Sequence, residues 1–256
     1  MQPRLAKGVQ QAGRDPERNP ELSLVIPAYN EAQTISSVVQ SWATHLTRLG
    51  IDYEMLAYDD GSSDLTGQIL EKLATGLAPL VARRHANMGH GPTILRGYRE
   101  ARGEWVFQVD SDEEMSPEHF KQLWLRRQGF DLLLGCRKDR KTSLVRLLLT
   151  AGSRATVRVL FGRTVQDVNT PYRLIRRSSL LRMLSSIPAD TFAPNVVMSG
   201  LAIRNGLSIH EAWIPHQGRK SGRGSLRWWR LGEAAVRSLV QTVAVAFRDW
   251  RSRRQC

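Results

Sequence analysis

Cysteine is scarce in this sequence: Cys136 and Cys256 are the only two among 256 residues. So few cysteines exclude a disulfide framework and a CxxC metal site, and they fit a reducing compartment. Long apolar runs are also missing, because no stretch approaches the roughly 20 consecutive apolar residues of a membrane-spanning helix. Residues 1–20 are charged and lack an apolar segment, so we expect a solvated, disordered tail and not a secretory signal.

Charge is divided unevenly between the two halves of the chain. Residues 1–128 contain 14 Lys and Arg against 17 Asp and Glu, a net charge of −3, whereas residues 129–256 contain 23 against 7, a net charge of +16. An acidic half joined to a basic half suggests a bound cation on one side and bound anions on the other. Nucleotides, lipid phosphates, a membrane surface and nucleic acid are all candidate partners at this point.

Short apolar runs alternate with helical patterns from residue 22 onward. Strands are expected over residues 22–29, 51–58, 77–84, 104–109 and 131–137. Helices are expected over residues 34–49, 64–75 and 93–102, and from residue 117. Strands that alternate with crossover helices predict an α/β fold with a mostly parallel, doubly wound sheet and helices on both of its faces. The length suits one domain, which we place over residues 21–225.

The basic half begins with a helical stretch over residues 143–161. A strand is expected over residues 170–177, helices over 180–185 and 194–205, and a strand over 207–215, followed by a polar loop over 216–225. The last segment, 226–256, has apolar residues at intervals of three or four with arginines between them: Val236, Val240, Val243, Phe247 and Trp250. This spacing predicts an amphipathic helix. The helix either packs on the domain or lies in the interface of an anionic membrane.

Three acidic groups follow strands of the predicted sheet. Asn30-Glu31 follows the first strand, Asp59-Asp60 the second, and the segment 110–114 the fourth. Each group alone could be a solvated turn. In an open α/β sheet, however, ligands bind beyond the carboxyl ends of the strands. The coincidence of three such groups therefore predicts a binding site at this edge.

The segment Asp110-Ser111-Asp112-Glu113-Glu114 concentrates carboxylates that would repel one another without a cation. Oxygen ligands at alternate positions, Asp110, Asp112 and Glu114, suit Mg²⁺ or Mn²⁺. Nucleotide phosphates would complete the coordination shell, and the metal would neutralise a diphosphate leaving group. A DxD pattern is weak evidence by itself. The segment Asn87-Met88-Gly89-His90-Gly91 is better explained as a tight turn that leads into a helix than as a dinucleotide-binding loop.

The motifs taken in order resemble a known family. They are VIPAYNE (25–31), DDGSSDLT (59–66), NMGHG (87–91), ARGEWVFQVDSDEE (101–114), GCR (135–137) and DVNTPYRLIRR (167–177). This set is similar to the family 2 inverting glycosyltransferases, in particular to the dolichyl-phosphate mannose synthases and the bacterial polyprenyl-phosphate glycosyltransferases. The resemblance covers roughly residues 22–225 and implies the GT-A fold.

The resemblance assigns roles in the donor half. It implies that Asp110 and Asp112 lie next to the metal, and that Asp112 also has a catalytic role. It places Glu114 where the family commonly has glutamine, and a glutamate can still bind the metal. The residues that it implies for nucleotide-sugar binding are Pro27, Tyr29, Glu31, Tyr58, Asp60 and Asp110.

In the second half, the resemblance implies that Arg137 meets phosphate and that Asp167 is the candidate base. If the acceptor is a lipid phosphate, its oxygen is already anionic and needs no strong base. Asp167 would then orient Arg173, position the acceptor or serve only as a salt-bridged residue. The implied phosphate or acceptor ligands are Arg137, Arg173, Arg219 and Arg223, although the loop that carries the last two could be only a solvated basic loop.

These expectations combine into one predicted activity. We expect metal-dependent, inverting transfer of a hexose from a GDP- or UDP-sugar to a polyprenyl phosphate, with the protein peripheral on the cytoplasmic face of the membrane. One alternative is a related transferase whose acceptor is a glycan or a small molecule. A second is a nucleic-acid-binding protein, suggested by the isoelectric point of about 10.6. We expect no nucleic-acid partner, because carboxylates gather at the binding edge and no nucleic-acid-binding motif is present.

Overall fold

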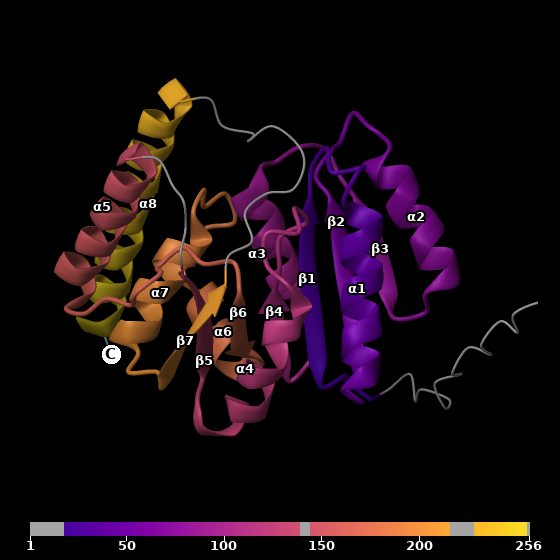
Figure 1. Cartoon of the computed structure of the whole chain (residues 1–256). Coiled ribbons are helices and arrows are strands. Elements are labelled where there is room, and N and C mark those ends of the chain that lie inside the picture. Colours follow the sequence, from indigo (N-terminus) through magenta and orange to yellow (C-terminus); the bar gives the residue numbers. More distant parts are fainter. Residues whose placement is uncertain (1–17, 139–143, 216–227, 255–256) are drawn as a thin grey trace, which may run out of the picture.

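The computed structural model describes residues 18–138, 144–215 and 228–254 as a seven-stranded sheet with helices on both faces (Figure 1). Most of the predicted tail lies outside the described residues. The division into a domain over 21–225 and a helical segment over 226–256 stays a prediction. The strands are β1 (Leu22–Ala28), β2 (Tyr53–Asp59), β3 (Leu80–Arg84), β4 (Trp105–Gln108), β5 (Leu132–Lys138), β6 (Arg173–Arg176) and β7 (Ile209–Pro215).

The helices cover two faces of the sheet. They are α1 (Ile35–Arg48), α2 (Thr66–Gly76), α3 (His90–Glu100), α4 (Phe120–Arg126), α5 (Leu144–Phe161), α6 (Arg177–Leu184), α7 (Pro194–Arg204) and α8 (Trp228–Arg254), with short 3₁₀ turns η1 (Pro117–His119) and η2 (Arg127–Gly129). One core joins the sheet to α1, α2 and α4. A second core joins it to α3 and α5–α8. All seven residues of β1 are buried, as expected for a strand covered on both sides.

The strand order is β3-β2-β1-β4-β6-β5-β7. Every neighbouring pair is parallel except those of β6, which runs antiparallel to both β4 and β5. The predicted mostly parallel α/β sheet is therefore confirmed. The carboxyl ends of the six parallel strands lie at one edge, the upper edge in Figure 1.

The reversed direction of β6 follows from the link between α5 and β6. After α5 the chain returns to the carboxyl edge, where Thr170 Oγ1 donates a hydrogen bond of 2.7 Å to the carbonyl of Gly135 in β5. β6 consequently enters the sheet from that edge and runs away from it. This link places Asp167 beside the end of β5.

The predicted C-terminal helix, α8, packs against α5 and α7. Its buried residues include Thr242, Val245 and Ala246. The side predicted to be apolar is turned largely outward, since Val240 is 60% exposed and Phe247 58%. The helix therefore packs on the domain through a side other than the one that the apolar spacing suggested. Among the described helices, none is both long and apolar enough to cross a bilayer.

Candidate active site

The loops after β1 and β2 are joined by hydrogen bonds at the carboxyl edge. The amide of Asn30 donates to Ser62 Oγ at 2.9 Å, and the amide of Glu31 donates to Thr66 Oγ1 at 2.8 Å. In return, the amide of Ser63 donates to Asn30 Oδ1 at 2.9 Å. Asn30 has a left-handed φ of 54°, a conformation that asparagine tolerates better than most residues. These contacts fix the backbone at Asn30 and Glu31 relative to the second strand end.

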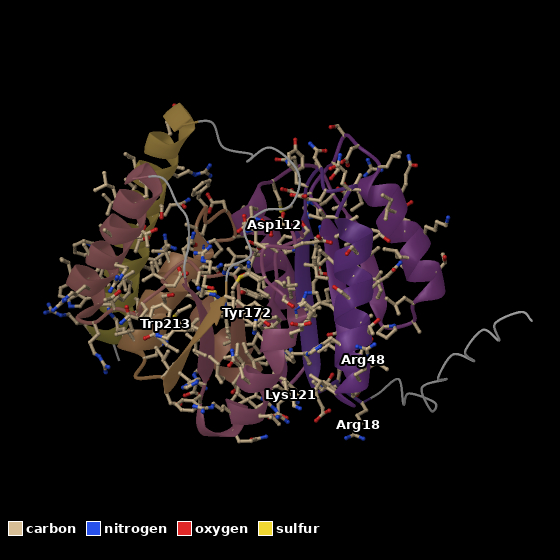
Figure 2. The ribbon with its side chains drawn as sticks, viewed as in Figure 1. Arg18, Arg48, Asp112, Lys121, Tyr172 and Trp213 are labelled. Carbon is tan, nitrogen blue, oxygen red and sulfur yellow. The ribbon has the colours of Figure 1, made fainter. Side chains whose placement is uncertain are left out.

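Thr34 connects the first loop to the acidic segment after β4. Its Oγ1 lies 2.8 Å from the carbonyl oxygen of Ser111 and 3.1 Å from Glu31 Oε2. Asp112 lies toward the carboxyl edge in Figure 2, whereas Arg18, Arg48 and Lys121 lie at the opposite edge. The three acidic groups predicted from the sequence therefore share one edge of the sheet.

The carboxylate of Asp60 is buried and engaged by the backbone of the turn after β3. Its Oδ1 accepts the amide of Met88 at 2.7 Å, and its Oδ2 accepts the amide of Gly89 at 3.0 Å. Gly89 has a φ of 96°, and α3 begins at the next residue, so the predicted turn into a helix is confirmed. Asp60 thus holds this turn, and its predicted contact with a nucleotide base is untested.

Other residues predicted for the nucleotide pocket differ in accessibility. Tyr29 is 46% exposed at the edge, and Glu31 is half-buried. Pro27 is buried within β1, and Tyr58 is 0% exposed, with its hydroxyl donating to Glu100 Oε2 at 2.9 Å. The prediction that Pro27 and Tyr58 line the pocket is therefore wrong for this structure, because both side chains are covered by neighbouring elements.

The acidic segment after β4 has two aspartates that could bind a cation. Asp110 is partly exposed and its Oδ1 accepts Gln108 Nε2 at 3.3 Å, while Asp112 Oδ1 accepts the amide of Glu114 at 3.1 Å. Within the described ranges, no three His, Cys, Asp or Glu side chains gather as a metal site, so the predicted set of three ligands is not preassembled. Mg²⁺ at nucleotide sites commonly takes one or two carboxylates and completes its shell with phosphate oxygens. Asp110 and Asp112 fit that kind of site.

His90, in the predicted turn over residues 87–91, is a neighbour of this segment that the sequence analysis did not assign to the site. Its Nε2 lies 3.6 Å from Asp110 Oδ1, and its side chain is 58% exposed. The sequence did carry a signal, since His90 begins the helix that follows β3 and therefore had to lie at the carboxyl edge.

Arg137 and Asp167 form a bidentate ion pair at the end of β5. Arg137 Nε donates to Asp167 Oδ2 at 2.7 Å, Nη2 donates to Oδ1 at 3.0 Å, and both side chains are largely buried. Burial alone would lower the pKa of Arg137, but the hydrogen bonds and charge of Asp167, with attraction from Asp110 and Glu114, raise it above the usual value. Arg137 is therefore a fixed positive charge between Asp167 and the acidic segment.

Arg173 has a different position from the one predicted. It is 0% exposed, and its guanidinium donates to the carbonyls of Thr170, Asn195 and Val168 at 3.0–3.3 Å. Burial lowers its pKa. A side chain enclosed in this way holds loop backbone together and cannot reach an acceptor, so the prediction that Arg173 binds phosphate is corrected. The other two predicted phosphate ligands, Arg219 and Arg223, lie outside the described residues.

A model of the protein family described as glycosyl transferase family 2 matches residues 23–184. Similar curated proteins include undecaprenyl-phosphate 4-deoxy-4-formamido-L-arabinose transferases. That of Pectobacterium carotovorum subsp. carotovorum (strain PC1) is 27% identical over 216 residues, which cover 82% of this chain and 64% of the relative. That of Pseudomonas aeruginosa (strain LESB58) is 28% identical over 215 residues, covering 82% and 61%. The chain therefore spans less than two thirds of the length of these relatives.

Two solved structures have a similar fold. Mannosyl-3-phosphoglycerate synthase from Rubrobacter xylanophilus has a TM-score of 0.66 at 16% identity, covering 93% of this chain and 76% of that one. Glucosyl-3-phosphoglycerate synthase from Mycobacterium tuberculosis, in complex with Mn²⁺, UDP-glucose and phosphoglyceric acid, has a TM-score of 0.63 at 18% identity, covering 89% and 80%. At these identities the likeness concerns the fold, which is the predicted GT-A architecture.

Proposed function

Because the chain belongs to glycosyl transferase family 2, we propose that it transfers a sugar from a nucleotide-sugar donor to a polyprenyl phosphate. The donor is a GDP- or UDP-sugar, the sugar is a hexose, and the reaction inverts the anomeric carbon. The observation that carries the proposal is the pairing of Arg137 with Asp167 beside the carboxylates of the acidic segment. Such an arrangement suits two anionic substrates that meet at one metal site.

The donor binds at the carboxyl edge, between the loops after β1 and β4. Of the residues predicted for the nucleotide pocket, Tyr29 and Glu31 are the ones on the first of these loops that solvent reaches. Asp110 and Asp112 would hold Mg²⁺ or Mn²⁺, and the metal would neutralise the charge of the diphosphate leaving group. The hydrogen bonds of Asp60 to Met88 and Gly89 keep the third loop in place. This part of the site needs little rearrangement to receive a nucleotide diphosphate.

Asp167 acts as a positioning residue. Both of its oxygens accept hydrogen bonds from Arg137, which fixes the guanidinium within the electrostatic influence of Asp110 and Glu114. A phosphate acceptor is already anionic at neutral pH, so its attack on the anomeric carbon requires alignment more than removal of a proton. Arg137 provides a positive charge for that alignment.

Two observations support a lipid-linked acceptor at a membrane. The names of the curated relatives specify undecaprenyl phosphate. In addition, the exposed apolar side chains of α8, such as Phe247 and Trp250, are flanked by the exposed arginines Arg237, Arg248 and Arg251. Apolar side chains bordered by cations suit an anionic lipid surface. We place the protein peripherally, on the cytoplasmic face.

Incubation of the purified chain with a panel of UDP- and GDP-sugars tests the proposal. The panel includes UDP-linked 4-deoxy-4-formamido-L-arabinose, and the acceptors are undecaprenyl phosphate and 3-phosphoglycerate. We expect a glycolipid product with undecaprenyl phosphate only. Transfer to 3-phosphoglycerate alone would reject the lipid acceptor.

Metal dependence is tested in the same assay. We expect excess chelator to abolish transfer, and Asp112→Asn to reduce turnover by roughly 10²–10³-fold, the size of effect seen when one electrostatic contact to a developing charge is lost. The asparagine oxygen can still accept the amide of Glu114, so the melting temperature should be unchanged. Full turnover in chelator would exclude the metal.

A further inference from the structure

A groove of about 220 Å³ lies between α5, α7 and α8, on the face of the sheet opposite α1. Its apolar lining includes Leu148 and Leu149 of α5, Val196 of α7, and Val236 and Leu239 of α8. Leu148 is 73% exposed and Val236 61%, which is unusual for neighbouring large apolar side chains on a folded domain.

Three of the hydroxyl groups at this groove are satisfied within their own helices. Ser153 and Thr156 of α5 donate to the carbonyls of Leu149 and Gly152, each at 2.9 Å. Thr242 of α8 donates to the carbonyl of Ser238 at 2.7 Å. The hydroxyl groups of these three residues therefore have no unused donor. An apolar ligand in the groove would not pay the desolvation cost of an unpaired hydroxyl donor there.

The groove is connected to the candidate active site by a short series of contacts. α8 touches the loop before α7, since the amide of Phe192 donates to Gln241 Oε1 at 2.7 Å. The carbonyl of Phe192 in turn lies against Gly91, at the start of α3. The preceding residue, His90, is the neighbour of Asp110. α5 also follows β5 in the chain, and the carboxyl end of β5 carries Arg137 of the site (Figure 1).

The surrounding charge favours an anionic ligand. α5 contains three arginines and no acidic residue. α8 contains six arginines against Glu233 and Asp249, and Asp249 already pairs with Arg204 of α7 at 3.3 Å. An apolar groove between two helices that are rich in arginine is complementary to a molecule with one hydrocarbon chain and one anionic head.

We propose that this groove binds the hydrocarbon chain of a prenyl phosphate. The proposal rests on the proposed function, in which a prenyl phosphate is the acceptor. The phosphate lies toward the carboxyl edge, and the isoprenoid chain runs between α5 and α8, away from Asp110. Chain recognition is then separate from recognition of the sugar donor.

Gly152 provides a way to fill the groove without disturbing the core. A Cβ added at Gly152 meets no atom within 4 Å, so the side chain of Gly152→Leu occupies open space in the groove. Gly76→Leu is the matched control, because Gly76 ends α2 on the other face of the sheet and also has no atom within 4 Å of an added Cβ. Both changes replace a helical glycine by a better helix former.

The measurement compares farnesyl phosphate with dimethylallyl phosphate, which has a single isoprene unit, both at concentrations below micelle formation. For Gly152→Leu we expect the ratio of KM for farnesyl to KM for dimethylallyl phosphate to rise about tenfold, or about 1.4 kcal/mol. Gly76→Leu should leave the ratio unchanged. An unchanged ratio in Gly152→Leu would overturn the chain-binding site.

Calorimetric titration with the same two compounds, without donor, separates this site from the proposed function. If farnesyl phosphate binds more tightly than dimethylallyl phosphate and Gly152→Leu removes the difference, the groove binds the chain whether or not any sugar is transferred. Failure of transfer to every prenyl phosphate would then reject the acceptor assignment alone. Equal binding of both compounds would overturn the proposal in favour of a solvated groove. If the only effect of Gly152→Leu were the loss of an oligomer, the groove would instead be an interface between copies of the chain.

Discussion

Arg137 and Arg173 are both buried arginines, and their partners give them different roles. Arg137 faces a carboxylate, so its charge is balanced and remains part of the site's field. Arg173 faces three neutral carbonyls, so its side chain acts as a cross-link between the loop at 168–170 and the start of α7. The guanidinium of Arg137 is thus paired with a charge, whereas the guanidinium of Arg173 satisfies backbone carbonyls.

The role of Arg173 can be tested through stability. Arg173→Met leaves the carbonyls of Thr170, Asn195 and Val168 without these donors, and buried acceptors without partners are costly. We expect a loss of about 3 kcal/mol or more in the free energy of unfolding. Urea denaturation checks this, with Arg176→Met, on a partly exposed arginine of the same strand, as the control. Unchanged stability together with a raised KM for the acceptor would restore the phosphate-binding role.

The role of Asp167 can be tested through the pH dependence of transfer. Asp167→Asn retains the shape of the side chain but removes the charge that orients Arg137, and a charged hydrogen bond contributes roughly 1.5–3 kcal/mol. We expect turnover to fall roughly 10–100-fold while the pH–rate profile keeps its shape. If Asp167 accepts a proton in the reaction, the acidic limb of the profile would instead disappear in the variant. Arg137→Lys should show a similar loss, because an ammonium cannot make the bidentate contact.

At the scale of elements, the strand ends were easier to predict than the orientation of side chains within strands. The residues of β1 and β2 are buried on both faces, so their sequences show no alternation that would tell which side chains face a ligand. Pro27 and Tyr58 were misplaced for that reason, whereas Tyr29 and Asp110, beyond the strand ends, were placed correctly at the edge. The position of a carboxylate after a strand is a local property of the sequence, and its exposure is not.

The direction of β6 and the packed side of α8 depended on distant contacts. β6 has four residues, and its apolar pattern is the same in either direction. Its orientation comes from the link that returns to the carboxyl edge at Thr170. In α8 the apolar spacing predicted the helix, but the surfaces of α5 and α7 accept its smaller side chains, among them Thr242 and Ala246. The GT-A fold could therefore be predicted, and these two details could not.

The turn after β3 gives a prediction at this scale. In Asp60→Asn, the amide nitrogen cannot accept a hydrogen bond, so the amide of Met88 or of Gly89 loses its acceptor. We expect a destabilisation of about 1–3 kcal/mol and faster hydrogen exchange at the turn. Glu71→Gln, on the exposed side of α2, is the control. Unchanged exchange would reject the anchoring role, and faster exchange with unchanged affinity for the nucleoside diphosphate would reject contact with the base.

At the scale of the whole molecule, the two halves differ in charge as the candidate substrates require. The first half carries the carboxylates at the carboxyl edge, and residues 129–256, which include α5–α8, carry a net charge of +16. A sugar nucleotide bound through a metal on the acidic side would face a basic surface that attracts lipid phosphate. Under the proposed function, the soluble donor and the lipid acceptor would reach the same edge from different sides.

The exposed side of α8 should then control binding to membranes. Val240→Ser with Phe247→Ser removes two exposed apolar anchors, and Arg248→Gln with Arg251→Gln removes two exposed cations. Each cation near an anionic surface contributes about 1 kcal/mol, so the arginine pair should weaken binding to anionic liposomes by roughly 30-fold, and less at high salt. Leu125→Ser, at a leucine of α4 that is at least as exposed as Val240 and Phe247, should have no effect, because that helix covers the other face. Co-sedimentation with liposomes measures the binding of all three variants. Unaltered binding in both α8 variants would place the membrane contact on another surface. Transfer to soluble prenyl phosphates should be unaffected in either case, because it does not require a membrane.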